Sequence, residues 1–192
     1  MKSIFKITVT ILVLFIGFEC SSKKENKQET RIEMTAEQIL GNPDYLAISY
    51  GGYREKSRED HQPTIPQLKE DLKLMHAMGI RIIRTYNVQP KLPHAANILE
   101  AISQLKKEDS NFEMYVMLGA WMDCLNAWTD QEPNHDIESA QNGEEIARAV
   151  ALANKYPDIV KVVAVGNEAM IKWATSYYVQ PSVILNWVNH LQ

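Results

Sequence analysis

The chain has 192 residues, of which 45% are hydrophobic and 23% charged, and its formal net charge is -4. This balance is typical of a globular protein with one sizeable core, and it excludes a chain that is disordered throughout. The charges form no long basic run, which argues against a nucleic-acid partner because phosphate binding favours clustered lysine and arginine. We therefore expect a neutral or small partner.

The N-terminal segment has the pattern of an export signal. Lys2 and Lys6 flank the start of an apolar run that extends from Ile7 to Phe18. A membrane-spanning helix needs roughly 20 apolar residues, and a shorter run suits the hydrophobic part of a signal peptide. Residues 1–20 are therefore predicted to direct the chain out of the cytoplasm.

Cys20 lies where this apolar run ends, and Ser-Ser-Lys-Lys follows it. The arrangement resembles a bacterial lipoprotein signal, in which Cys20 would carry the lipid and anchor the protein to a membrane. The alternative is a conventional cleaved signal or an uncleaved anchor, with Cys20 incidental and the protein secreted or periplasmic. Cys124 is the one later cysteine, so no intrachain disulfide is expected in the mature chain.

A change of pattern separates a linker from a folded domain. Residues 21–43 are polar, show no strong periodicity and end in Gly-Asn-Pro, so they are predicted to form a flexible linker. Residues 44–192 are predicted to form the domain. From Tyr45 onward, short β-branched or apolar runs alternate with longer amphipathic stretches, which is typical of βα units.

Four strands and four helices are expected in this domain. The strands are predicted over 45–50, 80–87, 112–119 and 159–166. The helices are predicted from 63–66 to Gly79, over 93–107, over 144–156, and from Pro181 toward the C-terminus.

This order of elements predicts an α/β protein with the (β/α)₈ TIM-barrel fold, truncated to about its first four βα units. A complete barrel takes about 250 residues, and the four units here occupy roughly 45–192. We expect a truncated reading frame, because half a barrel leaves two unpaired sheet edges. The alternative is a small doubly wound sheet, but no glycine-rich phosphate loop follows the first strand.

The ends of the predicted strands carry the residues with chemistry, since the active site of such a barrel forms at the carboxyl ends of its strands. Aromatic rings, hydrogen-bonding groups and a carboxylate would meet there. The candidate residues are Glu168 for catalysis and Tyr50, Arg84, Tyr86, Trp121 and Asn167 for substrate binding. Cleavage of a glycosidic bond needs a carboxylic acid that protonates the leaving oxygen, and Glu168 suits that role. Asn167 and Glu168 can serve one site only if Glu168 lies beyond the regular strand, because neighbouring strand residues point to opposite faces.

Three of these strand ends resemble a known family. The segments 48–51 (Ile-Ser-Tyr-Gly), 83–86 (Ile-Arg-Thr-Tyr) and 165–168 (Val-Gly-Asn-Glu) are similar to the first, second and fourth strand motifs of glycoside hydrolase family 17. That family comprises β-1,3-glucanases and related glucanosyltransferases with retaining barrels. The resemblance implies that Glu168 is the acid/base and that Asn167 contacts the sugar. It also implies that the cleavage subsite is lined by aromatic residues.

Tyr50 and Tyr86 are the aromatic residues that the resemblance assigns to the cleavage subsite. The resemblance further implies a nucleophilic glutamate after the seventh strand, and no residue of this chain matches it. The sequence therefore predicts a protein of the retaining endo-β-1,3-glucanase type that acts on β-glucan or a related oligosaccharide and is inactive as this chain. The alternatives are a non-catalytic glucan-binding surface lipoprotein and a β-1,3-glucanosyltransferase.

Structural roles compete with several of these assignments. Glu168 could be a charge at a helix N-terminus, with Asn167 as the cap. Arg84 could hold a structural ion pair, and Trp121 could be a packing residue, as could the two tyrosines. The histidines show no close pairing at metal-ligand spacing and Cys124 lacks a CxxC partner, so neither a metal nor another cofactor is expected. An esterase is disfavoured because no Gly-x-Ser-x-Gly motif occurs.

Overall fold

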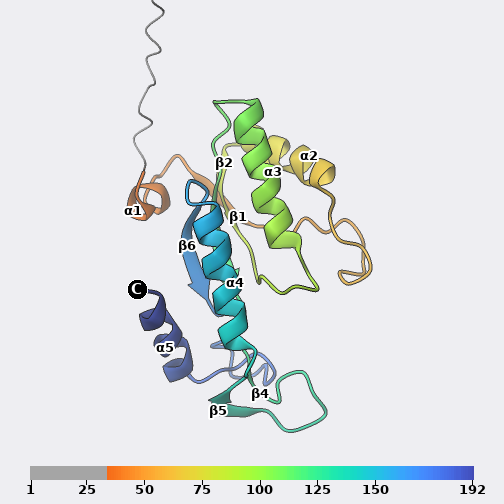
Figure 1. Ribbon diagram of the computed structural model, residues 1–192, viewed down its shortest axis with the longest axis vertical. Coiled ribbons are helices and arrows are strands. Elements are labelled where there is room, and N and C mark those ends of the chain that lie inside the picture. The colour runs from red at the N-terminus through yellow and green to blue at the C-terminus, as the bar shows by residue number, and fades with distance from the viewer. Residues whose placement is uncertain (1–33) are drawn as a thin grey trace, which may run out of the picture. The chain divides into compact units, whose positions relative to one another are not determined.

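The computed structural model describes residues 34–192 (Figure 1). The predicted signal peptide over 1–20, the proposed lipid site at Cys20 and the first part of the linker lie outside the described residues. Within residues 34–192, none of the helices combines the length and the apolar character needed to cross a bilayer.

A four-stranded parallel sheet forms the centre of the domain. Its strands are β1 (Leu46–Ser49), β2 (Ile80–Arg84), β3 (Tyr115–Ala120) and β6 (Val160–Val165). The order in the sheet is β1-β2-β3-β6, so each strand pairs in parallel with the one that precedes it among these four. This arrangement confirms the predicted α/β class. The sheet is open at both edges, and residues 34–192 form no closed barrel.

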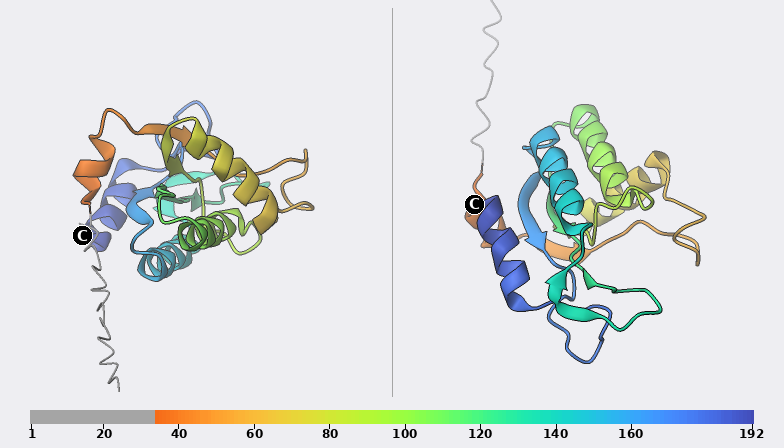
Figure 2. Two further views of the ribbon diagram at one scale, coloured as in Figure 1. Left: turned by 90° about the horizontal axis from the view of Figure 1, so that it is seen from above. Right: turned by 60° about the horizontal axis from the view of Figure 1, so that its bottom comes forward.

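Helices follow the strands in alternation. They are α2 (Ile65–Ala77), α3 (His94–Glu108), α4 (Asn142–Lys155) and α5 (Pro181–Leu191). Seen from above, they follow one another around one side of the sheet (Figure 2). The first of them begins at a capping box in which the Thr64 side chain accepts a hydrogen bond from the Gln67 amide, and it ends just before Gly79, whose φ of 87° favours glycine.

The hydrophobic core lies between these helices and the sheet. Residues that are at most 2% exposed come from both layers. Examples are Leu72 of α2, Ile83 of β2, Ile98 of α3, Leu118 of β3 and Ile146 of α4. Because helices and strands contribute these residues at the spacing expected for one apolar face each, the predicted elements agree with the observed ones to within a few residues.

Two features differ from the prediction. The helix α1 (Ala36–Leu40) lies inside the segment 21–43 that was predicted to be a flexible linker, so that prediction is wrong for its last part. A capping box between Thr35 and Gln38 starts this helix, and Ile39 is 1% exposed. A single buried residue in so short a helix gives no periodicity that the sequence could reveal.

The second difference is an antiparallel pair, β4 (Cys124–Leu125) and β5 (Asn134–Glu138), in the connection between β3 and α4. No strand was predicted there from the sequence. The strand β4 has only two residues, and four of the five β5 residues are exposed. The pair therefore lacks the alternation of apolar and polar residues that predicts strands. This pair extends the loop that follows β3.

Among residues 34–192, no helix packs closely on the outer face of β1. Ile48 lies beside Ile83 in the sheet register, and Ile83 packs in the core on the helix side. Ile48 therefore points to the same side, yet it is 42% exposed, and Leu46 is 54% exposed. The helix α2, which follows β1 in the chain, packs on β2 instead. An apolar strip on the first strand is thus left open to solvent.

Candidate active site

The carboxyl ends of the four parallel strands lie at one edge of the sheet, and the sequence candidates lie there. Tyr50 follows β1, Arg84 ends β2 with Tyr86 just beyond it, Trp121 follows β3, and the pair Asn167-Glu168 follows β6. The nearest α-helix after this pair, α5, begins at Pro181. The alternative in which the pair caps a helix is therefore wrong.

A hydrogen bond joins two of the predicted motifs. Arg84 donates from Nη2 to Oδ1 of Asn167 over 2.9 Å, across the intervening strand β3. Because a guanidinium only donates, the amide oxygen of Asn167 must face Arg84, which leaves the amide nitrogen as the free donor. Within the described residues this nitrogen has no partner, although Asn167 is only 8% exposed. Its free N–H group is thus held in place at the strand edge.

This contact changes the role of Arg84. From the sequence, Arg84 was predicted to bind the substrate, with a structural ion pair as the alternative. No carboxylate of residues 34–192 pairs with Arg84, so the ion-pair alternative is wrong, and its side chain orients Asn167. The geometry makes it a residue that positions a neighbour.

The backbone leaves the strand abruptly before Glu168. The strand β6 ends at Val165, Gly166 has a φ of 82°, and Glu168 has a φ of 55°. Glu168 therefore lies beyond the regular strand, which is the condition for Asn167 and Glu168 to serve one site. A left-handed backbone at a residue other than glycine is unfavourable by about 1–2 kcal/mol and is often found at functional sites. The Glu168 side chain is exposed at this edge.

A pocket opens beside β1 and β2 at the same edge. It has a volume of about 410 Å³, and Tyr50, Tyr53 and Tyr86 contribute to its wall. The Tyr50 hydroxyl donates to Oδ2 of Asp71 on α2 over 2.7 Å, and Oδ1 of Asp71 pairs with Arg54 at 2.5 Å. Burial, together with the Asp71 contact, raises the pKa of Tyr50 above its ordinary value. Tyr50 therefore offers its ring to the pocket while its hydroxyl is already bonded.

His94 packs against Tyr53, one of the residues that line this pocket. It is fully buried at the start of α3, and its Nδ1 lies 2.8 Å from the Tyr53 hydroxyl and 3.0 Å from the carbonyl oxygen of Leu92. Its Nε2 is buried without a hydrogen-bond partner among the described residues. Burial lowers the pKa of His94 to about 4.

This depressed pKa predicts a specific loss of stability in acid. Between the ordinary histidine pKa of about 6.5 and the folded value of about 4, the unfolded chain binds a proton that the folded chain excludes. The contribution is complete above pH 6.5 and falls as the pH drops toward 4, by about 3 kcal/mol in all. Urea unfolding at several pH values should therefore show a shallower pH dependence in His94→Gln than in the wild type. The exposed His61, replaced in the same way, should leave the wild-type slope unchanged, and equal slopes in all three proteins would contradict this account.

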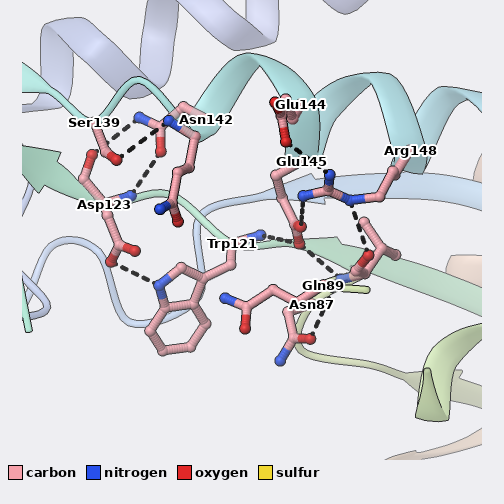
Figure 3. A network of polar contacts seen from close by, with 11 residues as sticks. Asn87, Gln89, Trp121, Asp123, Ser139, Asn142, Glu144, Glu145 and Arg148 are labelled. Carbon is pink, nitrogen blue, oxygen red and sulfur yellow. Dashed lines mark hydrogen bonds and ion pairs between the residues drawn. The ribbon is translucent and has the colours of Figure 1, made fainter. Parts of the chain in front are cut away.

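A buried carboxylate on α4 ties the two central loops together (Figure 3). Glu145 is 3% exposed. Its Oε1 accepts from the backbone N–H of Val88 at 2.7 Å and from that of Trp121 at 3.1 Å, and its Oε2 pairs with Arg148 at 3.1 Å. Val88 follows β2 and Trp121 follows β3, so one side chain sets the backbone of both loops. The sequence signal for this residue was weak: Glu145 shares the buried face of α4 with Asn142 and Ala149 at helical spacing.

Replacing Glu145 by Ala is expected to lower the free energy of unfolding by about 3 kcal/mol, because two buried N–H groups and one guanidinium lose their acceptor. Urea denaturation measures this loss. Glu144→Ala is a matched control, since Glu144 also pairs with Arg148 but its side chain is 78% exposed. We expect less than about 0.5 kcal/mol there. A similar loss in both variants would show that the buried contacts of Glu145 contribute nothing of their own.

The loop after β3 is fixed at a second point. Asn142, 2% exposed, accepts from the Asp123 N–H and donates to the Asp123 carbonyl, both over 2.9 Å. The Asp123 carboxylate in turn accepts from the Trp121 indole at 2.7 Å (Figure 3). The Trp121 ring is partly buried and lies 5.5 Å from the ring of Tyr177.

In residues 34–192, no three His, Cys, Asp or Glu side chains converge as a metal site would require.

Comparison with known proteins gives one informative likeness. No protein-family model matches the chain, and no curated protein matches it. Among solved structures, an endo-laminarinase from Formosa Hel1_33_131 is 69% identical and superposes with a TM-score of 0.80. The match covers 83% of this chain. This likeness supports a glucan-hydrolase family. The α/β fold of this chain thus matches that of a glycosidase, and the chain spans 40% of the length of that laminarinase.

Proposed function

We propose that this chain contributes the acid/base half of a retaining endo-β-1,3-glucanase of glycoside hydrolase family 17, with Glu168 as the acid/base. The observation that carries the proposal is the bond from Arg84 to Asn167 beside the left-handed Glu168, at the carboxyl edge of a parallel sheet. The likeness to an enzyme named as an endo-laminarinase supports a β-glucan as the substrate.

Each residue has a distinct task in the proposed reaction. Glu168 donates its proton to the leaving glycosidic oxygen while a nucleophilic carboxylate, which no residue of this chain matches, bonds to the anomeric carbon. The Glu168 carboxylate then takes a proton from the water that displaces this nucleophile and releases the product. The free N–H of Asn167 donates to a sugar hydroxyl, and this bond strengthens in the oxocarbenium-like transition state. Arg84 keeps the Asn167 amide in the orientation that this contact requires.

We also infer that the four βα units belong to a (β/α)₈ barrel. The exposed Leu46 and Ile48 on β1 support this, because in a closed barrel a further helix covers the outer face of the first strand. A glutamate after the seventh strand would be the nucleophile, and no residue of this chain matches it. We therefore expect the 192-residue chain to bind β-glucan without hydrolysing it. We further propose that the chain is exported and that a lipid at Cys20 anchors it to a membrane.

Reconstitution tests the proposal. The part of the Formosa laminarinase that has no counterpart in this chain would be produced separately and mixed with it, and release of reducing sugar from laminarin would be measured. We expect hydrolysis in the mixture and none with either part alone. Glucan binding without turnover in a mixture that forms a stable complex would instead favour the non-catalytic binding protein. Products longer than the substrate would favour the glucanosyltransferase.

A further inference from the structure

Three aromatic side chains gather at the carboxyl edge on the side of β3 and β6. Trp121 follows β3, Trp128 lies between β4 and β5, and Tyr177 lies between β6 and α5. Tyr177 has its ring centroid 5.5 Å from that of Trp121 and 4.8 Å from that of Trp128, and the two tryptophans are 6.3 Å apart. These separations are those of aromatic groups in direct contact. We refer to these three residues as the aromatic platform.

One carboxylate oxygen holds both tryptophans of the platform. Oδ1 of Asp123 accepts from the Trp121 indole N–H at 2.7 Å and from the Trp128 indole N–H at 3.0 Å. Burial raises the pKa of Asp123, and the two indole bonds act in the opposite direction. The backbone of Asp123 is itself fixed by Asn142. The rings are therefore set in place before any ligand arrives.

Core packing does not account for Trp128. Its side chain is 54% exposed, and its backbone has a φ of 62°, with Asn126 at 64°. For a bulky residue such a φ is a marked outlier, and strained backbones of this kind cluster at ligand sites. A strained tryptophan that remains half exposed gains little from burial. Trp173 provides a contrast: it is 87% exposed, and among the described residues it has neither a ring contact nor a hydrogen bond through its indole.

We propose that the aromatic platform is a stacking subsite for a sugar ring of the glucan chain, separate from the pocket lined by Tyr50 and Tyr86. This inference rests on the proposed function. Glu168 and Tyr177 belong to the same connection after β6, which places the platform on the Glu168 side of the edge. The flat C–H face of a pyranose fits the electron-rich face of an indole or phenol.

The sheet order sets the length of the ligand. The pocket extends from Tyr50 after β1 to Tyr86 after β2, and the platform extends from Trp121 after β3 to Tyr177 after β6. Neighbouring strands are about 4.8 Å apart, so three spacings separate β1 from β6 by roughly 14 Å in a flat sheet. A monosaccharide or disaccharide cannot reach from Tyr50 to Tyr177. The platform therefore selects for longer oligosaccharides, as an enzyme that cuts within a chain requires.

Binding of β-1,3-linked oligosaccharides of increasing length to the full chain tests this subsite. Isothermal titration calorimetry would compare the wild type, Trp128→Ala and the matched control Trp173→Ala. For the hexasaccharide and longer chains we expect Trp128→Ala to weaken affinity roughly tenfold. For the disaccharide we expect less than about a twofold change. Trp173→Ala should bind every length as the wild type does.

A pair of substitutions at Asp123 separates the position of the rings from the stability of the fold. Both indoles donate to the same oxygen, and Asn retains an equivalent acceptor. Asp123→Asn should therefore bind long oligosaccharides as the wild type does, whereas Asp123→Ala should lose as much affinity as Trp128→Ala. Binding that Trp128→Ala leaves unchanged, or weakens equally at every length, overturns the subsite alone. A wild-type chain that binds no β-glucan overturns the proposed function and the subsite with it.

Discussion

Glu168→Gln is expected to reduce laminarin hydrolysis by the reconstituted enzyme between about a hundredfold and ten thousandfold, which is the range that a general acid contributes. Glutamine has the size of the glutamic acid but has no proton to give to the glycosidic oxygen. Its amide can still contact the sugar, so affinity for laminarin should change little. Initial rates at saturating laminarin, together with a binding isotherm, measure the two effects separately.

With an activated aryl glycoside, whose leaving group needs no proton, the first step should recover in Glu168→Gln and show as a burst of released phenol. Turnover should stay slow because the water still lacks its general base, and added azide, which needs no base, should restore it. Glu132→Gln serves as the matched control, since Glu132 is exposed between β4 and β5, and it should retain the wild-type rate. If laminarin hydrolysis survives in Glu168→Gln, another residue is the acid, and the assignment fails.

Gly119→Ala is expected to destabilise the domain by about 3 kcal/mol, at the upper end of the range for overpacked cores. A Cβ at this position in β3 would lie 2.4 Å from the backbone oxygen of Thr85 and 2.7 Å from the backbone carbon of Tyr86. These are backbone atoms, so the end of β2 must shift to admit the methyl group. Thermal unfolding should show a decrease of roughly 10 °C for a domain of this size, and the displaced Tyr86 should also weaken glucan binding.

Gly143→Ala is the corresponding control. Gly143 lies in the first turn of α4, where an added Cβ would meet the Trp187 ring at an ordinary 3.6 Å. Alanine restricts the unfolded chain and favours the helix, so we expect a gain of about 0.4–1 kcal/mol. If both variants lost equal stability, the close approach of β2 to β3 would not be the cause.

The βα elements were predictable because each helix and strand buries one face. Leu68, Leu72 and Met75 recur at helical spacing, and Gly79 marks the end of α2. The structures that escaped prediction lack such a face. The helix α1 buries Ile39 alone, and the pair β4–β5 depends on contacts with distant segments, such as the bond from the Gln180 amide to the His135 carbonyl.

The site was predictable in its location but only partly in its contacts. Parallel strands bring their carboxyl ends together, so the sequence could place Tyr86 and Glu168 at one edge. It could not show that Arg84 bonds Asn167, because those residues lie 83 positions apart and only the folded sheet makes them neighbours. Asp123 had no predicted role although Trp121 and Trp128 are only two and five positions away, because a loop has no periodicity that reveals which side chains meet. Its importance arises from two indoles that the fold brings to one oxygen.

The strand order has a consequence for how the domain is made. Because β1, β2, β3 and β6 pair in the order in which they are synthesised, each new strand needs only the preceding unit as its template. The sheet therefore forms with low contact order for a parallel architecture, and it can assemble stepwise as the chain leaves the ribosome. The apolar strip at Leu46 and Ile48 then belongs to the first strand made, so it is exposed from the earliest stage of synthesis. We expect this strip to be the part of the nascent chain that most needs a chaperone.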